Sequence, residues 1–288
     1  MITPEKYVFL GDNSPESVEA FTRDVLQKPV IPSGEIAHTP ELTACLADMI
    51  SAVRDYCLSL GIDVVNRLPT ESNFHFYPEA VWPEVRKPYQ KADWTGAFNS
   101  YEGNAFVCWR SRGGDIFQDS LLYANHELVH LVSYCAITLE LRETIVEAKE
   151  IQVGYRPTSG INFRTFSECV TEEISLEVVD GFWVMFPRLQ WGSKEYYHGA
   201  GIGRLQFLLA LAQRTHERGY RPGVVLKLLY KGLFLGTIEG LEALKNTLGE
   251  EKFEILKTMD PHSEQEAREI ARQLGLLELA DKDGAFLL

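Results

Sequence analysis

The segment Asn-His-Glu-Leu-Val-His, residues 125–130, constrains this chain more than any other stretch. On a helix, His126 and His130 are separated by about 400°, so their imidazoles project from one face, one turn apart. Two imidazoles at that spacing can share one Zn²⁺ ion. Glu127 is rotated by about 100° from His126, where it reaches a water on the ion more easily than the ion itself. The segment therefore predicts His126 and His130 as zinc ligands and Glu127 as a general base.

The residues around this segment are mostly apolar, and they predict a buried helix over residues 119–139. A buried helix that carries two histidines and a glutamate would hold unsatisfied polar groups unless they had partners. A shared metal ion is one such partner, and a chance occurrence of the pattern is the alternative.

A catalytic zinc ion needs three protein ligands and one open position, so a second buried helix should supply the third ligand. In the segment FSECVTEEISLEVV, residues 166–179, Glu168 and Glu172 are four apart and share one face. We predict that Glu168 is the third ligand and that Glu172 accepts a hydrogen bond from the outer nitrogen of His126. Two more acidic residues of this segment, Glu173 and Glu177, are expected to be solvated. The alternative is that all four glutamates form one solvated face.

The order of these motifs resembles the gluzincin metallopeptidases, whose thermolysin-like, aminopeptidase and minimal members share H-E-x-x-H followed by a helix with E-x-x-x-[D/E]. NHELVHLV is similar to their active-site helix, and FSECVTEE to their third-ligand helix. Two residues depart from the family pattern: Ser167 replaces the usual asparagine and Cys169 the usual small residue. The resemblance covers roughly residues 72–212 and implies a zinc metallopeptidase with one Zn²⁺ ion per chain.

A third segment agrees with the family. Residues Asn104 to Val107, Asn-Ala-Phe-Val, are similar to the edge strand of thermolysin-like enzymes, which implies that Asn104 and Ala105 bind the substrate. An edge strand offers free backbone groups to an extended peptide, whereas the alternative is an ordinary strand. GAFN at 96–99 is similar to the G-x-M-E-N of aminopeptidases but lacks its glutamate, for which Glu102 is a candidate. We therefore favour an endopeptidase over an aminopeptidase.

The segment EYYHGAGIGRL begins at residue 195 and is similar to the Y-x-K-G-A of aminopeptidase gluzincins. Aligning its Gly-Ala places Tyr196 at the tyrosine and His198 at the lysine. A phenol can donate to a developing oxyanion without carrying a charge beforehand. The resemblance implies Tyr196 as the oxyanion donor, with His198 and Tyr197 as alternatives.

The pattern of the whole chain predicts an α+β protein of the zincin-like, two-lobed kind. An N-terminal α/β lobe, residues 1–115, would contain a mixed sheet with a substrate-facing edge strand. A helical lobe, residues 116–288, would carry the zinc site, with the active-site helix and a cleft between the lobes of one catalytic unit. Strands are expected near 5–11 and 74–77 and twice within 93–109. Helices are expected from Pro15, from Pro40 to about Ser59, and over 119–139, 166–182, 195–217, 222–233, 237–247 and 262–275.

The 288-residue chain is 45% hydrophobic with a net charge of −13, which is typical of a soluble globular protein. The negative charge argues against nucleic acid or an anionic membrane as a partner and leaves a peptide or protein substrate. No signal peptide is recognisable, and the five cysteines are expected to be reduced and buried, so we expect a cytoplasmic protein. The pattern gives no oligomeric state.

Two further functional classes are compatible with these motifs. One is a catalytically inactive, zinc-binding relative that serves as a binding or scaffold protein. The other is a helical interaction protein without a metal. Intact Glu127 and an available tyrosine favour the zinc-dependent peptidase.

Overall fold

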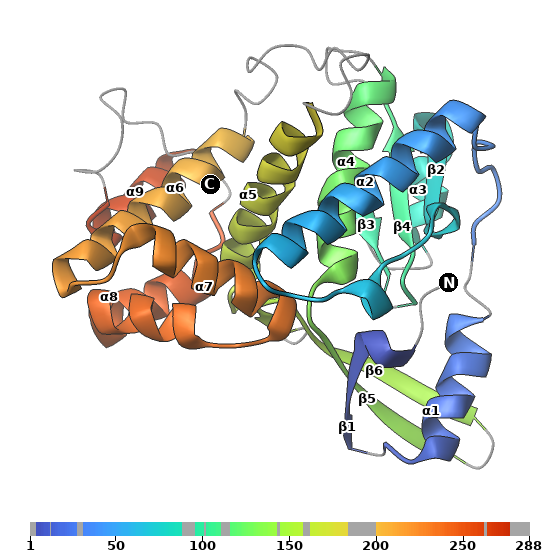
Figure 1. Ribbon diagram of the computed structural model, residues 1–288, viewed down its shortest axis with the longest axis horizontal. Coiled ribbons are helices and arrows are strands. Elements are labelled where there is room, and N and C mark those ends of the chain that lie inside the picture. The colour runs from blue at the N-terminus through green and yellow to red at the C-terminus, as the bar shows by residue number, and fades with distance from the viewer. Residues whose placement is uncertain are drawn as a thin grey trace. The chain divides into compact units, whose positions relative to one another are not determined.

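Figure 1 shows the fold of the chain in a computed structural model. It describes residues 4–11, 13–27, 31–87, 96–100, 102–110, 116–142, 145–157, 162–183, 200–261 and 264–276. The architecture is α+β, with mixed sheets and a helical C-terminal part, as the sequence predicts. Within these ranges, no helix is long and apolar enough to cross a membrane.

Packing divides the chain into two compact units. Unit 1 comprises Met1–Glu150 and Val178–Trp191, and unit 2 comprises Ile151–Glu177 and Gly192–Leu288. Helix α5 (Arg164–Trp183) contributes residues to both. The lobe boundary at residue 115 and the cleft between the lobes stay predictions.

A three-stranded sheet lies at the centre of unit 1, in the order β2-β4-β3. Strand β2 (Phe74–Pro78) runs parallel to β4 (Ala105–Trp109), and β3 (Ala97–Asn99) runs antiparallel to β4. The sheet is therefore mixed, and β4 is its central strand. The two strands predicted within 93–109 are confirmed for the described residues.

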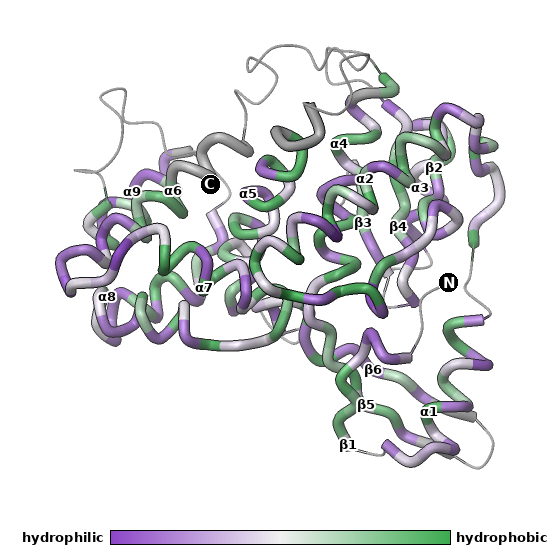
Figure 2. The backbone as a smooth tube through the Cα atoms, in the orientation of Figure 1, coloured by the Kyte–Doolittle hydropathy of each residue, from purple (hydrophilic) through white to green (hydrophobic). Residues whose placement is uncertain are grey.

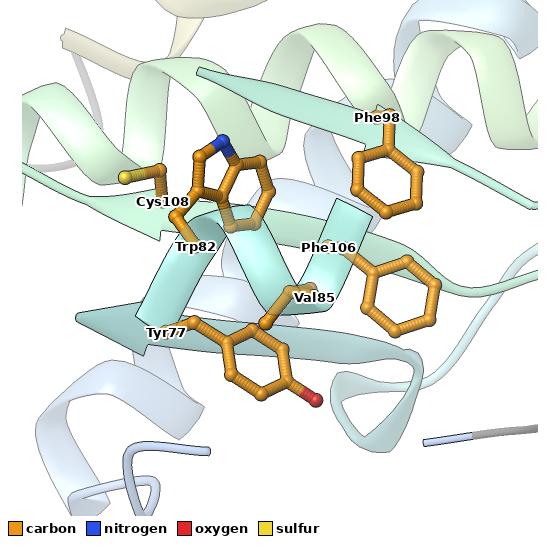
Figure 3. Packing of buried hydrophobic residues seen from close by; sticks show 6 residues of the cluster. All are labelled: Tyr77, Trp82, Val85, Phe98, Phe106 and Cys108. Atoms are coloured by element: carbon orange, nitrogen blue, oxygen red, sulfur yellow. The ribbon is translucent and has the colours of Figure 1, made fainter. Parts of the chain in front are cut away.

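One face of this sheet carries an aromatic cluster (Figure 3). Phe98 and Phe106 stack with ring centroids 4.9 Å apart, and Tyr77 continues the row from β2 at 6.4 Å from Phe106. Helix α3 (Trp82–Arg86) covers the row, with Trp82 against Phe98. Side chains of this size contribute most of the apolar burial in a small core.

The first two helices begin as their sequences require. Ser14 caps α1 (Pro15–Phe21), and Thr39 caps α2 (Pro40–Ser59), each with proline in the first turn. Buried residues recur along α2 at intervals of three or four: Leu42, Leu46, Met49, Val53 and Cys57. Figure 2 shows the matching alternation of hydrophobic and hydrophilic turns along this helix. A π-helix, Thr22–Leu26, follows α1, and 3-10 helices cover Pro4–Lys6, Val65–Arg67, Glu71–Asn73 and Glu79–Val81.

A second sheet has the order β1-β5-β6-β7, with β1 (Tyr7–Gly11) parallel to β5 (Cys135–Arg142). The remaining strands are β6 (Ile145–Val153) and β7 (Arg156–Pro157). The prediction of a helix to residue 139 is wrong beyond residue 132, because α4 (Ile116–Val132) ends there. The residues that follow alternate apolar and polar side chains with β-branched residues, a pattern that favours strands.

The helices of unit 2 agree with the predicted ones. They are α6 (Ala200–Arg214), α7 (Pro222–Leu235), α8 (Glu239–Thr258) and α9 (Glu264–Leu274), with a 3-10 helix at Thr215–Arg218. Gly249 interrupts α8 with φ 77° and ψ 168°, a conformation that glycine tolerates, so α8 extends beyond the predicted end at 247 through a kink.

All five cysteines are free thiols and are buried, as predicted. Burial raises the pKa of Cys135 to about 12 and that of Cys108 to about 11. A thiol with such a pKa is almost wholly protonated near neutral pH, and it is a poor nucleophile and metal ligand.

Within unit 2, Tyr155 joins the segment after β6 to α7. Its hydroxyl donates a 2.6 Å hydrogen bond to the carbonyl oxygen of Leu229. Burial raises the pKa of this hydroxyl, which keeps the donor proton in place. The hydroxyl occupies the position next to Gly232, where an added Cβ would lie only 1.9 Å from the tyrosine oxygen.

The substitution Gly232→Ala is therefore expected to lower the free energy of unfolding by about 2 kcal/mol, because the methyl group forces Tyr155 out of its contact. Gly223→Ala on the same helix is the matched control, since nothing lies within 4 Å of its Cβ position. It should leave stability unchanged or raise it by about 0.5 kcal/mol. Urea denaturation followed by circular dichroism measures both, and equal midpoints for the two variants would contradict this packing.

Candidate metal centre

Helix α4 of unit 1 carries the two histidines of the candidate site and packs against β3 and β4 (Figure 1). The side of the helix opposite the histidines is apolar and fully buried, which fixes the helix on the sheet. Its residues with 0% exposure include Leu121, Ala124, Leu128, Val129 and Val132. The histidine-bearing face is thus held by a large apolar contact on the other side.

His126 and His130 point their Nε2 atoms toward one another, as the four-residue spacing predicts. The two nitrogens are 3.2 Å apart, and the rings lie with centroids 4.9 Å apart at an interplanar angle of 74°. Tetrahedral zinc with Zn–N bonds of 2.0–2.1 Å would separate two nitrogens by about 3.3–3.4 Å. A hydrogen bond between two neutral imidazoles would give a similar distance, so the pair alone does not identify a metal.

Glu168 on α5 supplies the third group. One ligand atom from each of His126, His130 and Glu168 lies within 4.8 Å of the other two. Elsewhere in the described ranges, no other set of histidine, cysteine, aspartate and glutamate meets this condition. His130 is buried and the other two are half-buried. Two imidazoles and one carboxylate are the donor set of a metal site with an open position, so the residues present fit a metal ion.

Glu127 follows His126 on α4 and is only 3% exposed. On a helix it is rotated by about 100° from His126, and it is not a member of the group of possible metal ligands. Its role as general base stays a prediction. Glu172, half-buried on α5, stays a predicted hydrogen-bond partner of His126.

Glu173 is a correction to the sequence analysis, which expects it to be solvated. It is 6% exposed, and the Tyr230 hydroxyl of α7 lies 3.4 Å from its Oε1 atom. The same hydroxyl lies 3.3 Å from Oε1 of Glu177, which is exposed as predicted. Tyr230 of α7 supplies a hydrogen-bond donor to a carboxylate that would otherwise lose its hydration. The sequence spacing could not show which residue of α7 would meet α5.

The position of Asn104 and Ala105 is a second correction. The strand that begins at Ala105 is central, not an edge strand, because Ala105 pairs with Phe74 on one side and Asn99 on the other. The Asn104 side chain is also engaged, since its Oδ1 lies 3.4 Å from Nδ2 of Asn73 and 3.3 Å from Nε2 of His75. The free backbone groups on which the predicted substrate contact depends are therefore absent at Ala105.

Strand β3, residues Ala97–Asn99, is an edge strand of this sheet within the described part of the chain. The opposite edge, formed by β2, is covered by the segment before α2. Ile36 donates its N–H to the Phe76 carbonyl at 2.7 Å, and Nε2 of His38 lies 2.9 Å from the Phe74 carbonyl oxygen. The sequence signal for an edge strand at this position is the GAFN segment at residues 96–99.

Three residues predicted near the oxyanion lie outside the described residues: Tyr196, Tyr197 and His198. Their roles stay predictions.

Comparison with known proteins adds no relative. No family model matches the chain, and no curated protein and no solved structure is significantly similar to it. The assignment of the site therefore depends on its own geometry.

Zinc titration tests the metal centre. The wild-type protein is expected to bind about one zinc ion per chain. His130→Ala and Glu168→Gln should weaken binding by more than about 100-fold, because losing a ligand costs more than losing an outer hydrogen bond. His216→Ala, which removes an exposed histidine, is the control and should bind zinc as the wild type does. Elemental analysis after dialysis gives the stoichiometry, and less than half an equivalent in the wild type would contradict the site.

Proposed function

We propose that this protein is a zinc-dependent hydrolase of peptide bonds, of the gluzincin type. The observation that carries the proposal is the convergence of His126, His130 and Glu168, with ligand atoms within 4.8 Å of one another. A zinc ion held there supplies Lewis acidity, which makes water a nucleophile near neutral pH and polarises a carbonyl oxygen.

The protein's own residues would then handle the proton and the charge. Glu127 would accept the proton of the attacking water on a carboxylate oxygen and pass it to the nitrogen of the leaving amine. Glu172 would hold the tautomer of His126 by accepting a hydrogen bond from its outer nitrogen. Tyr196, or alternatively His198 or Tyr197, would donate a hydrogen bond to the oxyanion.

Strand β3 takes over the substrate role that the sequence analysis gives to Asn104 and Ala105. It ends the sheet beside α4, and the strand is anchored there because the Tyr123 ring packs on Gly96, where an added Cβ would lie 2.5 Å from a ring carbon. A peptide that pairs with β3 would be held extended, whatever its sequence, alongside the histidine-bearing helix. This supports a peptide substrate over a small hydrolysable molecule.

An aminopeptidase is the second candidate. Glu102 lies in the turn between β3 and β4, and its Oε2 atom is buried without a hydrogen-bond partner among the described residues. A carboxylate of this kind suits the ammonium group of a free amino terminus. Blocking the amino terminus of a peptide substrate separates the two activities, because an endopeptidase still cleaves it.

The catalytic proposal predicts that Glu127→Gln lowers kcat by about 10²–10⁴-fold with zinc retained, because the amide cannot accept a proton. Glu84→Gln, an exposed glutamate of α3, is the control and should leave kcat unchanged. Digestion of a peptide library read by mass spectrometry measures the rates and locates the bonds cut. Equal cleavage by wild type and Glu127→Gln would exclude this mechanism and leave a zinc-binding scaffold protein.

A further inference from the structure

Arg110 follows the last residue of β4, at the end of the sheet where β3 begins. The Cys108 N–H donates to the Gly96 carbonyl there at 2.8 Å, so Arg110 and Gly96 lie at the same end. The guanidinium carbon of Arg110 lies 6.0 Å from the centroid of the Tyr123 ring. Tyr123 therefore contacts both the start of β3 and the arginine.

Tyr123 also places Arg110 near the candidate metal centre. It precedes His126 by three residues on α4, so the two side chains lie on one stripe of the helix, with Cα atoms about 5 Å apart. Adding the length of the tyrosine side chain and the 6.0 Å from its ring puts the guanidinium carbon within about 15 Å of the Cα atom of His126 at most. An extended peptide covers that distance with about four residues.

The guanidinium of Arg110 has unused hydrogen-bonding capacity. Its Nε atom is buried and has no hydrogen-bond partner in the described part of the chain. A carboxylate oxygen of Glu79 lies 4.0 Å from Nη1 and belongs to a side chain that is 70% exposed, whereas the arginine side chain is 22% exposed. A pair with one exposed partner at this distance is weak, so an incoming carboxylate can compete with Glu79.

The guanidinium of Arg110 carries its positive charge at neutral pH. Partial burial lowers the pKa of the guanidinium, but the interactions with Tyr123 and with nearby groups, Glu79 among them, outweigh that effect and raise it. A buried N–H without a partner costs free energy, and a carboxylate that forms a forked pair with the guanidinium would recover it.

We propose that Arg110 forms a carboxylate-binding subsite beside the candidate metal centre, and that it selects peptides with an acidic group within about four residues of the bond that is cut. The acidic group is either an Asp or Glu side chain or a free C-terminal carboxylate. This inference deepens the proposed peptidase function. The selection of peptides rests on that function, whereas the binding of a carboxylate by Arg110 does not.

The binding arm of the test does not require cleavage. The full-length, zinc-loaded protein is titrated by calorimetry with succinate and with its neutral analogue succinamide. Succinate should bind at least about tenfold more tightly than succinamide, and Arg110→Gln should weaken succinate binding by about tenfold or more. Arg110→Lys should retain part of the affinity, because it keeps the charge but loses the fork. Succinate bound only through zinc would be insensitive to Arg110→Gln, which would overturn the subsite.

Glu79→Gln is the matched variant, since it removes the competing carboxylate from an exposed position. It should bind succinate as tightly as the wild type or more tightly, whereas weaker binding would contradict the assigned competition. Thermal melting of the four proteins shows whether each is folded. If Arg110→Gln does not fold, Arg110→Lys is still expected to bind succinate more weakly than Glu79→Gln, and equal affinities would overturn the inference.

The cleavage arm distinguishes the two sources of the carboxylate. Peptides with a blocked C-terminus carry Asp or its isostere Asn at each position around the cut bond, and a second set without acidic side chains has a free or amidated C-terminus. An Arg110-dependent preference of about tenfold in kcat/KM for one set identifies the source. Cleavage without any such preference would overturn the inference and leave the proposed function intact. Arg110-dependent succinate binding without cleavage of any peptide would support the carboxylate subsite and contradict the proposed peptidase function.

Discussion

The rest of the candidate site depends on two imidazole nitrogens that lie 3.2 Å apart on α4. That distance is close to the separation of two nitrogens bound to one tetrahedral zinc ion. It suits two neutral rings that share a metal ion or a proton. The helix fixes the spacing of the two histidines, and its apolar contact with the sheet fixes the direction in which they project. The geometry of the pair therefore depends on secondary structure and packing.

The glutamates of α5 show how position on a helix divides one residue type among several tasks. Glu168 is near the histidines, Glu173 is buried beside Tyr230, and Glu177 is exposed. Burying a carboxylate requires a compensating partner, which the Tyr230 hydroxyl provides for Glu173. Buried or half-buried glutamates on a helix such as α5 therefore indicate a functional site, whereas an ordinary amphipathic helix keeps its carboxylates exposed.

Much of the fold and the convergence of the candidate metal ligands could be predicted, because they follow from local spacing. The His126–His130 spacing needs only helical periodicity, and the start of α2 needs only Thr39 and Pro40. The strand order could not be predicted, since Ala105 is central only because β2 pairs with it from 31 residues earlier in the chain. The pairing of β1 with β5 is equally non-local, and the helix predicted through residue 139 ignores the strand pattern after Cys135. Arg110 has no motif, and only its buried Nε indicates a ligand.

X-ray absorption spectroscopy of the zinc-loaded protein tests the central claim most directly, because it reports the atoms bonded to the metal. The account predicts a first shell of nitrogen and oxygen at about 2.0–2.2 Å, with outer-shell scattering from two imidazoles and no sulfur. His126→Ala should remove one imidazole from that signal. A sulfur shell at about 2.3 Å, or a shell without imidazole scattering, would contradict the claim that His126, His130 and Glu168 hold the ion.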